Sequence, residues 1–197
     1  LKLAPKSDMA AKKFERKSTI RETDDKEDGG GGVMATLKDG RIFEKVGVNV
    51  SAVYGKLAPE AQKSITARKA IPELKDDPRF WASGISLVAH MRNPHTPAIH
   101  LNTRMFWTPH AWWFGGGTDL NPSIENNDDT NFFHQTLKRK CDKHNQSYYK
   151  KFKEWADEYF FIPHRKVARG VGGIFFDDLC TGDWAVSYTH LRAHETG

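Results

Sequence analysis

The stretch that decides the fold reads Pro97-Ala98-Ile99-His100-Leu101-Asn102-Thr103-Arg104. Within it, His100, Asn102 and Arg104 lie two residues apart, a spacing that places three side chains on one face of a β-strand. The residues between them are mostly apolar and would face the other side. An imidazole, an amide and a guanidinium on one face favour the wall of a polar site, although a solvated amphipathic strand has the same pattern.

A second run follows closely and reads Ala111-Trp112-Trp113-Phe114-Gly115-Gly116-Gly117-Thr118-Asp119. We predict that residues 112–114 pair with the first stretch as a hairpin. Asp119 follows three consecutive glycines, where a backbone without side chains can approach a ligand closely. The alternative for the glycines is a flexible turn without a function.

Outward from these runs, alternation with a period of two predicts strands, and apolar spacing of three to four residues predicts helices. The expected elements are a strand from residue 42 to about 51, a helix over 59–69, a strand over 83–90, a helix from Asp128 or Asp129 to about 144, an aromatic-rich helix over 148–159 and a short buried strand over 174–176. We expect the aromatic residues Phe152, Trp155 and Tyr159 in the core.

The two ends of the chain differ from its middle. Residues 1–28 are highly charged and poor in large apolar residues, so we expect a flexible segment, with residues 9–20 as a candidate surface helix. Glycines 29–32 predict a linker or a turn. Residues 180–197 continue no upstream pattern, and we expect them to be foreign to a domain formed by residues 29–179.

Composition restricts the class of protein. A length of 197 residues suits one domain. The net charge of +5 weakly indicates an anionic partner, with small carboxylates or phosphates competing with nucleic acid. The two cysteines, Cys141 and Cys180, form no disulfide framework and suit a reducing compartment. No apolar run approaches the length of a membrane span, and we expect no secretory signal.

Several histidines are candidates for chemistry. Those near expected strand ends or on helix faces are His90, His100, His134 and His164. Four imidazoles could bind a transition metal, but their separations follow no short ligand motif. A hydrogen-bonded structural role is the alternative, and we expect it for His134 in particular.

Residues 164–173 form a basic run that leads into glycines. The cations Arg165, Lys166 and Arg169 precede a glycine-rich turn and a buried strand. Because arginine binds carboxylates in a bidentate fork, this run and Arg104 would suit a ligand with several carboxylates. A solvated basic loop is the alternative. No Ser-His-Asp order, Cys-x-x-Cys pair or complete dinucleotide motif is present.

Taken together, these motifs resemble those of the oxygen-dependent coproporphyrinogen-III oxidase family. The matching segments are glycines 29–32, residues 43–51, residues 93–94 with 100–104, residues 112–120, residues 159–165 and residues 169–179. They occur in the family's order and cover about residues 29 to 179. The resemblance therefore rests on several long motifs.

This resemblance implies an α+β fold with a large antiparallel sheet flanked by helices on both faces, the sheet being incomplete in this fragment. It implies oxidative decarboxylation of two propionate groups of coproporphyrinogen III to vinyl groups, giving protoporphyrinogen IX in haem biosynthesis, with O2 as oxidant. No organic cofactor is expected; a divalent metal is described for some bacterial members, and its role is disputed. We also expect a homodimer, no nucleic-acid partner, no membrane span and a cytoplasmic location, with the mitochondrial intermembrane space as the alternative.

The resemblance also assigns roles to residues by position. His100 corresponds to the proposed proton donor, and Asp119 to an aspartate proposed to engage the pyrrole N–H groups. The substrate-binding positions are Ser86, Asn102, Thr103, Arg104, Arg165 and Arg169. The four positions proposed as metal ligands in bacterial members are His90, His100, His134 and His164.

Departures from the family pattern leave a second function open. Ala156 replaces a usual cysteine, Val167 a usual glutamate, and Cys180 an aspartate at the point where the match stops. The family's C-terminal third, with a further substrate-binding segment, is not matched. The alternative is therefore a truncated, inactive fragment that binds a tetrapyrrole or a carboxylate. A metal-dependent oxygenase built on the histidines is a further hypothesis, and a nucleic-acid module lacks a suitable motif.

Overall fold

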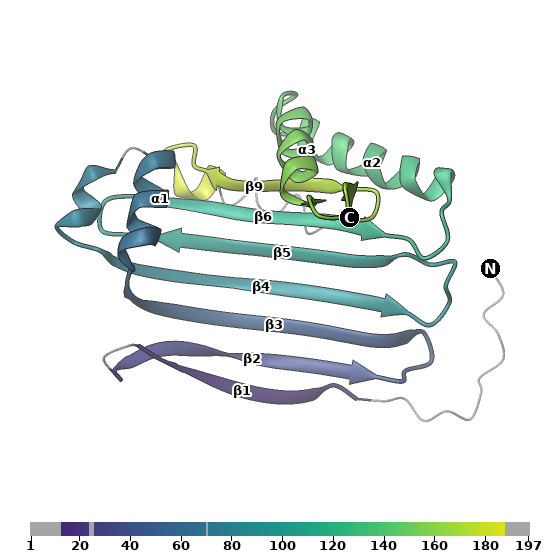
Figure 1. Cartoon of the computed structure of the whole chain (residues 1–197), viewed down its shortest axis with the longest axis horizontal. Coiled ribbons are helices and arrows are strands. Elements are labelled where there is room, and N and C mark those ends of the chain that lie inside the picture. Colours follow the sequence, from purple (N-terminus) through teal and green to yellow (C-terminus); the bar gives the residue numbers. More distant parts are fainter. Residues whose placement is uncertain (1–12, 24–25, 70, 188–197) are drawn as a thin grey trace.

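The computed structural model describes residues 13–23, 26–69 and 71–187. Seven antiparallel strands form its main sheet, in the order β1-β2-β3-β4-β5-β6-β9 (Figure 1). These strands are β1 (Glu15–Glu22), β2 (Asp28–Lys38), β3 (Phe43–Lys56), β4 (Arg79–Met91), β5 (Ala98–Trp107), β6 (Trp112–Asn121) and β9 (Gly173–Leu179). Strands that follow one another pair as far as β6, and β9 then joins the other edge of β6.

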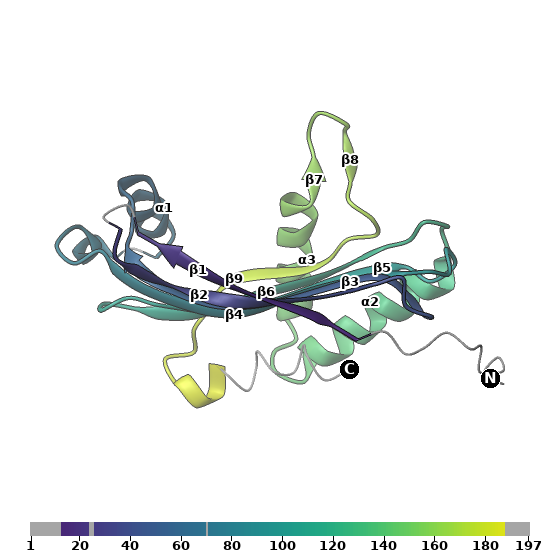
Figure 2. The same cartoon turned by 90° about the horizontal axis from the view of Figure 1, so that it is seen from below.

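Helices cover both sides of this sheet. α1 (Pro59–Lys69) and the small hairpin of β7 (Phe161–Ile162) and β8 (Val167–Ala168) rise on one side, and α2 (Asn127–Asp142) lies on the other (Figure 2). α3 (Tyr148–Tyr159) packs against β9, and a 3-10 helix (Pro72–Lys75) follows α1. The predicted α+β fold with helices on both faces is confirmed, whereas the incompleteness of the sheet stays a prediction.

The pairing of the strands fixes a polar face. His100 lies opposite Asp119 of β6, and Asn102 lies opposite Ser86 of β4. Residues directly opposite in an antiparallel sheet share a face. The polar face is defined here by the side chains of Ser86, His100, Asn102, Arg104 and Asp119. The predicted spacing along β5 is therefore confirmed, and α1 packs over one end of this face through Ile65 and Trp113.

The other side of the same strands is the apolar face, defined by Leu101, Thr103, Met105, Phe114 and Phe176. Leu137 and Cys141 of α2 pack on it around the buried Phe114 and Phe176. Burial of one such side chain contributes roughly 1.5–3 kcal/mol to folding. Phe152 of α3 belongs to the same cluster, so α2 and α3 together form this core with the end of the sheet.

The aromatic residues of α3 divide between core and surface. Phe152 is buried and stacks on Phe176 with ring centroids 4.8 Å apart, which confirms its predicted place in the core. Trp155 is half-buried against Phe175. Tyr159 is 61% exposed although its ring stacks on Phe175, so the core prediction for Tyr159 is wrong. It lies at the last turn of α3, where little of the chain covers it.

The three glycines after the aromatic run lie inside β6 and not in a turn. A Cβ at Gly115 would collide with the carboxylate of Asp177 and lie 2.9 Å from Arg104 Nε. At Gly116, a Cβ would lie 2.9 Å from the carbonyl oxygen of Asn102. The expectation of a flexible turn is wrong, because glycine in a strand interior permits this close approach of neighbours.

The N-terminal part contains the largest errors of the sequence-based prediction. Residues 15–22 form the exposed strand β1, paired with β2, and not part of a helix over 9–20 or a flexible segment. Glycines 29–32 lie within β2, where a Cβ at Gly32 would collide with the carbonyl oxygen of Val50. Residues 1–12 and 188–197 lie outside the described residues. The division of the chain at residues 28 and 179 stays a prediction.

The remaining expected elements are confirmed with small changes of their ends. The helices over 59–69 and 148–159 have the predicted bounds, and the strands over 42–51, 83–90 and 174–176 are longer than predicted. The cap of α2 is Asn126, whose side-chain oxygen accepts from the backbone N–H of Asp128, instead of Asp128 or Asp129. No helix in the described part of the chain is both long and apolar enough to span a membrane.

Candidate functional site

Asp119 is the centre of the polar face, and it is only 1% exposed. Its carboxylate accepts two hydrogen bonds from Arg169, from Nε at 3.0 Å and Nη2 at 2.9 Å. The side-chain amide of Asn121 donates to the same carboxylate at 2.7 Å, and His100 Nδ1 lies 3.3 Å from it. A buried charge is costly unless it is paired, and here a guanidinium fork supplies the pairing.

His100 is a partly exposed member of this cluster, with 32% of its side chain accessible. When its Nδ1 carries a proton, that N–H donates to Asp119 and leaves Nε2 free to exchange a proton with a bound molecule. The same Nδ1 lies 3.2 Å from the side-chain nitrogen of Asn121, so Asp119 and Asn121 together fix the orientation of the ring. This arrangement of a partly open imidazole on a buried carboxylate suits general acid–base chemistry.

The glycine-rich loop after β8 brings Arg169 to Asp119. Its backbone is tied to β6, since Val171 N–H donates to the carbonyl oxygen of Leu120 at 3.0 Å. Gly170 has a φ of +58°, and a Cβ there would collide with the same carbonyl oxygen. Arg169 also lies over the Phe160 ring at 4.2 Å. Residues 163–170 are exposed, as in a solvated basic loop, but their connection to β6 holds Arg169 against Asp119.

A second cluster lies farther along β5. Arg104 Nε donates to Asp177 Oδ1 at 3.0 Å, and Arg68 of α1 donates to Asp177 Oδ2 at 3.1 Å. Sequence reasoning missed Arg68 and Asp177. Asp177 was visible as an acidic residue at the end of a buried strand, but nothing in the sequence places α1 above β9.

The other expected substrate-binding residues fall in different places. Ser86 and Asn102 line a hollow of about 320 Å³ on the polar face, together with Asn49 and Ser51 of β3. Thr103 is buried on the apolar face, so its side chain does not line the polar face. Arg165 is exposed on the β7–β8 hairpin, and its side chain has no ion pair with another described residue.

The four histidines do not converge within the described residues. His90 and His100 have ring centroids 6.2 Å apart. His134 lies on α2, where Nε2 is 2.9 Å from the carbonyl oxygen of Val171 and Nδ1 is 3.1 Å from the Tyr149 hydroxyl, which confirms its structural role. His164 is exposed on the hairpin. In the described ranges, no three or more His, Cys, Asp or Glu side chains are placed to hold a metal ion.

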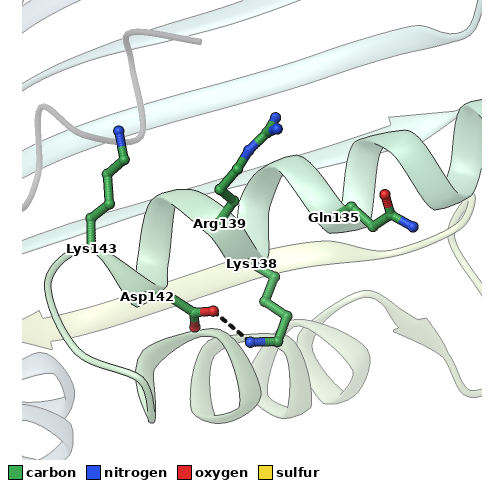
Figure 3. Close-up of a pocket in the computed structure, with 5 residues that line it drawn as sticks. All are labelled: Gln135, Lys138, Arg139, Asp142 and Lys143. Atoms are coloured by element: carbon green, nitrogen blue, oxygen red, sulfur yellow. Dashed lines mark hydrogen bonds and ion pairs between the residues drawn. The ribbon is translucent and has the colours of Figure 1, made fainter.

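A further hollow lies on α2, on the other side of the sheet. It has a volume of about 390 Å³ and is lined by Gln135, Lys138, Arg139, Asp142 and Lys143 (Figure 3). Its one carboxylate, that of Asp142, accepts from Lys138 one turn away. With no histidine or second acid among its lining residues, this surface offers cations but no acid–base pair.

Comparison with known proteins shows which family this chain belongs to. The family model of coproporphyrinogen III oxidase matches residues 6–195. The chain is 49% identical over 161 residues to the mitochondrial oxygen-dependent coproporphyrinogen-III oxidase of Homo sapiens, covering 79% of this chain and 36% of the human protein. It therefore belongs to the oxygen-dependent coproporphyrinogen-III oxidase family, as the motifs predicted.

Other relatives agree. The enzyme of the same name from Drosophila melanogaster is 52% identical over 158 residues, covering 77% of this chain and 40% of that protein. The Rickettsia conorii enzyme is 49% identical over 173 residues, covering 88% and 59% respectively. The chain thus spans between about a third and three fifths of the length of the curated relatives it matches.

Proposed function

We propose that the polar face binds coproporphyrinogen III and that the reaction is oxidative decarboxylation of two propionate groups to vinyl groups, giving protoporphyrinogen IX. The observation that carries this proposal is the His100–Asp119–Arg169 cluster on a face that also bears Arg104. A porphyrinogen with four carboxylates needs cations to hold it and one fixed group to move protons. The family name of the relatives supports the same substrate.

Each step requires a two-electron oxidation. A –CH2–CH2–COOH group and O2 become –CH=CH2, CO2 and H2O2, so the substrate loses two electrons and O2 gains them. The proton that leaves the substrate must be taken up near the reacting side chain. His100 is the group that exchanges this proton, Asp119 orients its ring, and Arg169 holds the Asp119 carboxylate in place.

Asp119 itself has a second proposed role, which is to accept hydrogen bonds from the pyrrole N–H groups. Its carboxylate has three partners within the chain, so a substrate would have to share or displace one of them. Asn121 is an uncharged partner with no part in the proton transfer, and we propose that its hydrogen bond is the one the substrate replaces. We also propose O2 as the only co-substrate, with no organic cofactor.

A second candidate function is a fragment that binds a tetrapyrrole but does not turn it over. The observation in its favour is the coverage of only 36–59% of the relatives' length. An anaerobically prepared coproporphyrinogen III solution, mixed with the chain and O2, separates the two. We expect protoporphyrin fluorescence with H2O2 release, at a rate unchanged by a chelator. Binding of coproporphyrin III without turnover would leave the fragment function, and binding of neither compound would contradict both.

Assembly and location are also proposals. We propose a homodimer, testable by sedimentation at several protein concentrations, in which a mass of one chain throughout would contradict it. We propose a cytoplasmic location, with the mitochondrial intermembrane space as the alternative. The human relative is named as mitochondrial, whereas the Rickettsia relative is bacterial.

A further inference from the structure

The Arg68–Asp177–Arg104 cluster joins three elements that are distant in sequence. Arg68 lies near the end of α1, Arg104 on β5 and Asp177 on β9, with Asp177 between the two guanidinium groups. The side chain of Asp177 is 17% exposed, whereas those of Arg68 and Arg104 are 38% and 37% exposed. The acid is thus the inner member, and both cations remain accessible from solution.

The surrounding residues are shaped to keep this cluster. Gly115 lies directly under it, and any Cβ there would strike the Asp177 carboxylate. Arg104 lies over the Phe175 ring at 5.7 Å. The next residue of α1, Lys69, donates to the carbonyl oxygen of Asp178 at 3.0 Å and lies over the Trp113 ring. Burial lowers the pKa of Lys69, and these contacts hold the end of α1 on β9.

The net charge of the Arg68–Asp177–Arg104 cluster and its unused N–H donors would allow it to bind an anion. Two guanidinium groups and one carboxylate leave one net positive charge in the cluster. Each guanidinium has five N–H donors; the bonds to Asp177 use one on each residue, and Arg104 Nη1 donates a further one to Asn102 Oδ1 at 3.4 Å. The neighbouring hollow of about 320 Å³ includes Ser86, Asn102 and Arg104 in its lining. A carboxylate entering this hollow would meet N–H groups that are already oriented.

The position of the cluster decides which carboxylate it can hold. Arg104 lies four residues from His100 along β5, which is roughly 14 Å of strand. Figure 2 shows α1 and the β7–β8 hairpin set apart along the same side of the sheet. A carboxylate held between Arg104 and Arg68 would therefore occupy a different part of the polar face from a propionate that reacts at His100, although Arg104 Nη1 also reaches Asn102 Oδ1, at 3.4 Å.

We propose that the Arg68–Asp177–Arg104 cluster is a second carboxylate site of the polar face, which holds a propionate that does not react. Arg68 and Arg104 bind the carboxylate, and Asp177 is the positioning residue that fixes both guanidinium groups. This proposal rests on the proposed function, and it adds α1 to the substrate site. Because the carboxylates that survive the reaction are those held here, the cluster binds substrate and product alike.

Fluorescence titration of the chain with two porphyrins tests this site. Coproporphyrin III has four carboxylates, and deuteroporphyrin IX keeps only the two that the reaction leaves. We expect Arg68→Gln to weaken both porphyrins about tenfold, as the loss of a charge-assisted hydrogen bond does at a half-exposed site. Lys63→Gln is the matched control, since Lys63 is an exposed cation of the same helix, and we expect no change.

Asp177→Asn separates positioning from simple charge. Removal of a negative charge beside an anion site strengthens binding if only the net charge matters. If Asp177 positions the two guanidinium groups, Asp177→Asn weakens both porphyrins severalfold, and Asp177→Glu restores part of the loss. Circular dichroism of each variant confirms that the sheet is intact.

The outcomes are distinguishable. Equal affinities of Arg68→Gln and Lys63→Gln, or tighter binding by Asp177→Asn, would overturn the second carboxylate site while leaving the proposed function in place. Weakening of coproporphyrin III alone would show that the cluster binds a reacting carboxylate and would also overturn it. If the unaltered chain binds neither porphyrin, the proposed function and this site both fall.

Discussion

The same strands form both faces of the sheet, but one face carries polar side chains and the other forms the apolar core. On the polar face, half-exposed cations and an imidazole surround the buried Asp119 and the partly buried Asp177. On the apolar face, Phe114 and Phe176 are at most 2% exposed under α2. Because side chains alternate along a strand, neighbours in sequence lie in the proposed binding site on one side and in the core on the other. Function and stability should therefore respond separately to substitutions one residue apart.

The largest expected effect separates His100 from Leu101. We expect His100→Ala to lower kcat for coproporphyrinogen III by about a hundredfold to ten-thousandfold, because a positioned general acid–base group contributes about that factor. The melting temperature should hardly change, since the ring is partly exposed. Leu101→Ala should instead lower the free energy of unfolding by about 2 kcal/mol and leave kcat of the folded protein unchanged. An unchanged kcat in His100→Ala would contradict a catalytic role of His100 on the polar face.

A smaller effect separates two adjacent glycines of β6. Gly115→Ala and Gly116→Ala should each cost about 1–3 kcal/mol of stability, because an added methyl meets packed neighbours on either face. Only Gly115→Ala displaces Asp177 and Arg104, so only it should raise KM for coproporphyrinogen III, by about tenfold. Thermal unfolding and steady-state kinetics check both variants. An equal KM for the two would contradict the assignment of Gly115 to the site.

The smallest expected effect concerns Asp77, which lies before β4 and away from both faces. Its hydrogen bonds to Arg79 lower the pKa of Asp77 from 3.8 to about 2. A lowered pKa in the folded state means that the pair stabilises the fold above about pH 4 and that this contribution is lost as the pH falls toward 2. Asp77→Asn should therefore be slightly less stable at pH 7, and most of the difference should disappear at pH 2, where about half of the Asp77 side chains are protonated, as judged by urea unfolding at both pH values. A difference at pH 2 as large as that at pH 7 would exclude the ion pair as its cause.

Local patterns in the sequence predicted much of this fold. The helices over 59–69 and 148–159 and the hairpin of β5 and β6 follow from apolar periodicity and turn residues. Period-two spacing also placed His100, Asn102 and Arg104 on one face. The bidentate pair of Asp119 and Arg169 was not predicted: the resemblance gave each residue a role towards the substrate, and 50 residues separate the two.

The errors have a common physical cause. Glycines 29–32 and 115–117 have poor strand propensity, yet both runs lie in strands because neighbouring chains approach too closely for a side chain. Residues 15–22 form a strand only through pairing with β2, a long-range contact that charge pattern does not reveal. The Arg68–Asp177 contact joins residues 109 positions apart and depends on how α1 crosses the sheet. Local patterns do not contain such information.

Whether His100 and Asp119 act as one unit is tested most directly by a double-mutant cycle on coproporphyrinogen III turnover. The rates to compare are those of the unaltered chain, His100→Ala, Asp119→Asn and the double variant. If Asp119 acts by holding His100, the second substitution adds almost nothing, and the double variant is as slow as His100→Ala alone. Two losses that multiply in the double variant would contradict a single His100–Asp119 unit.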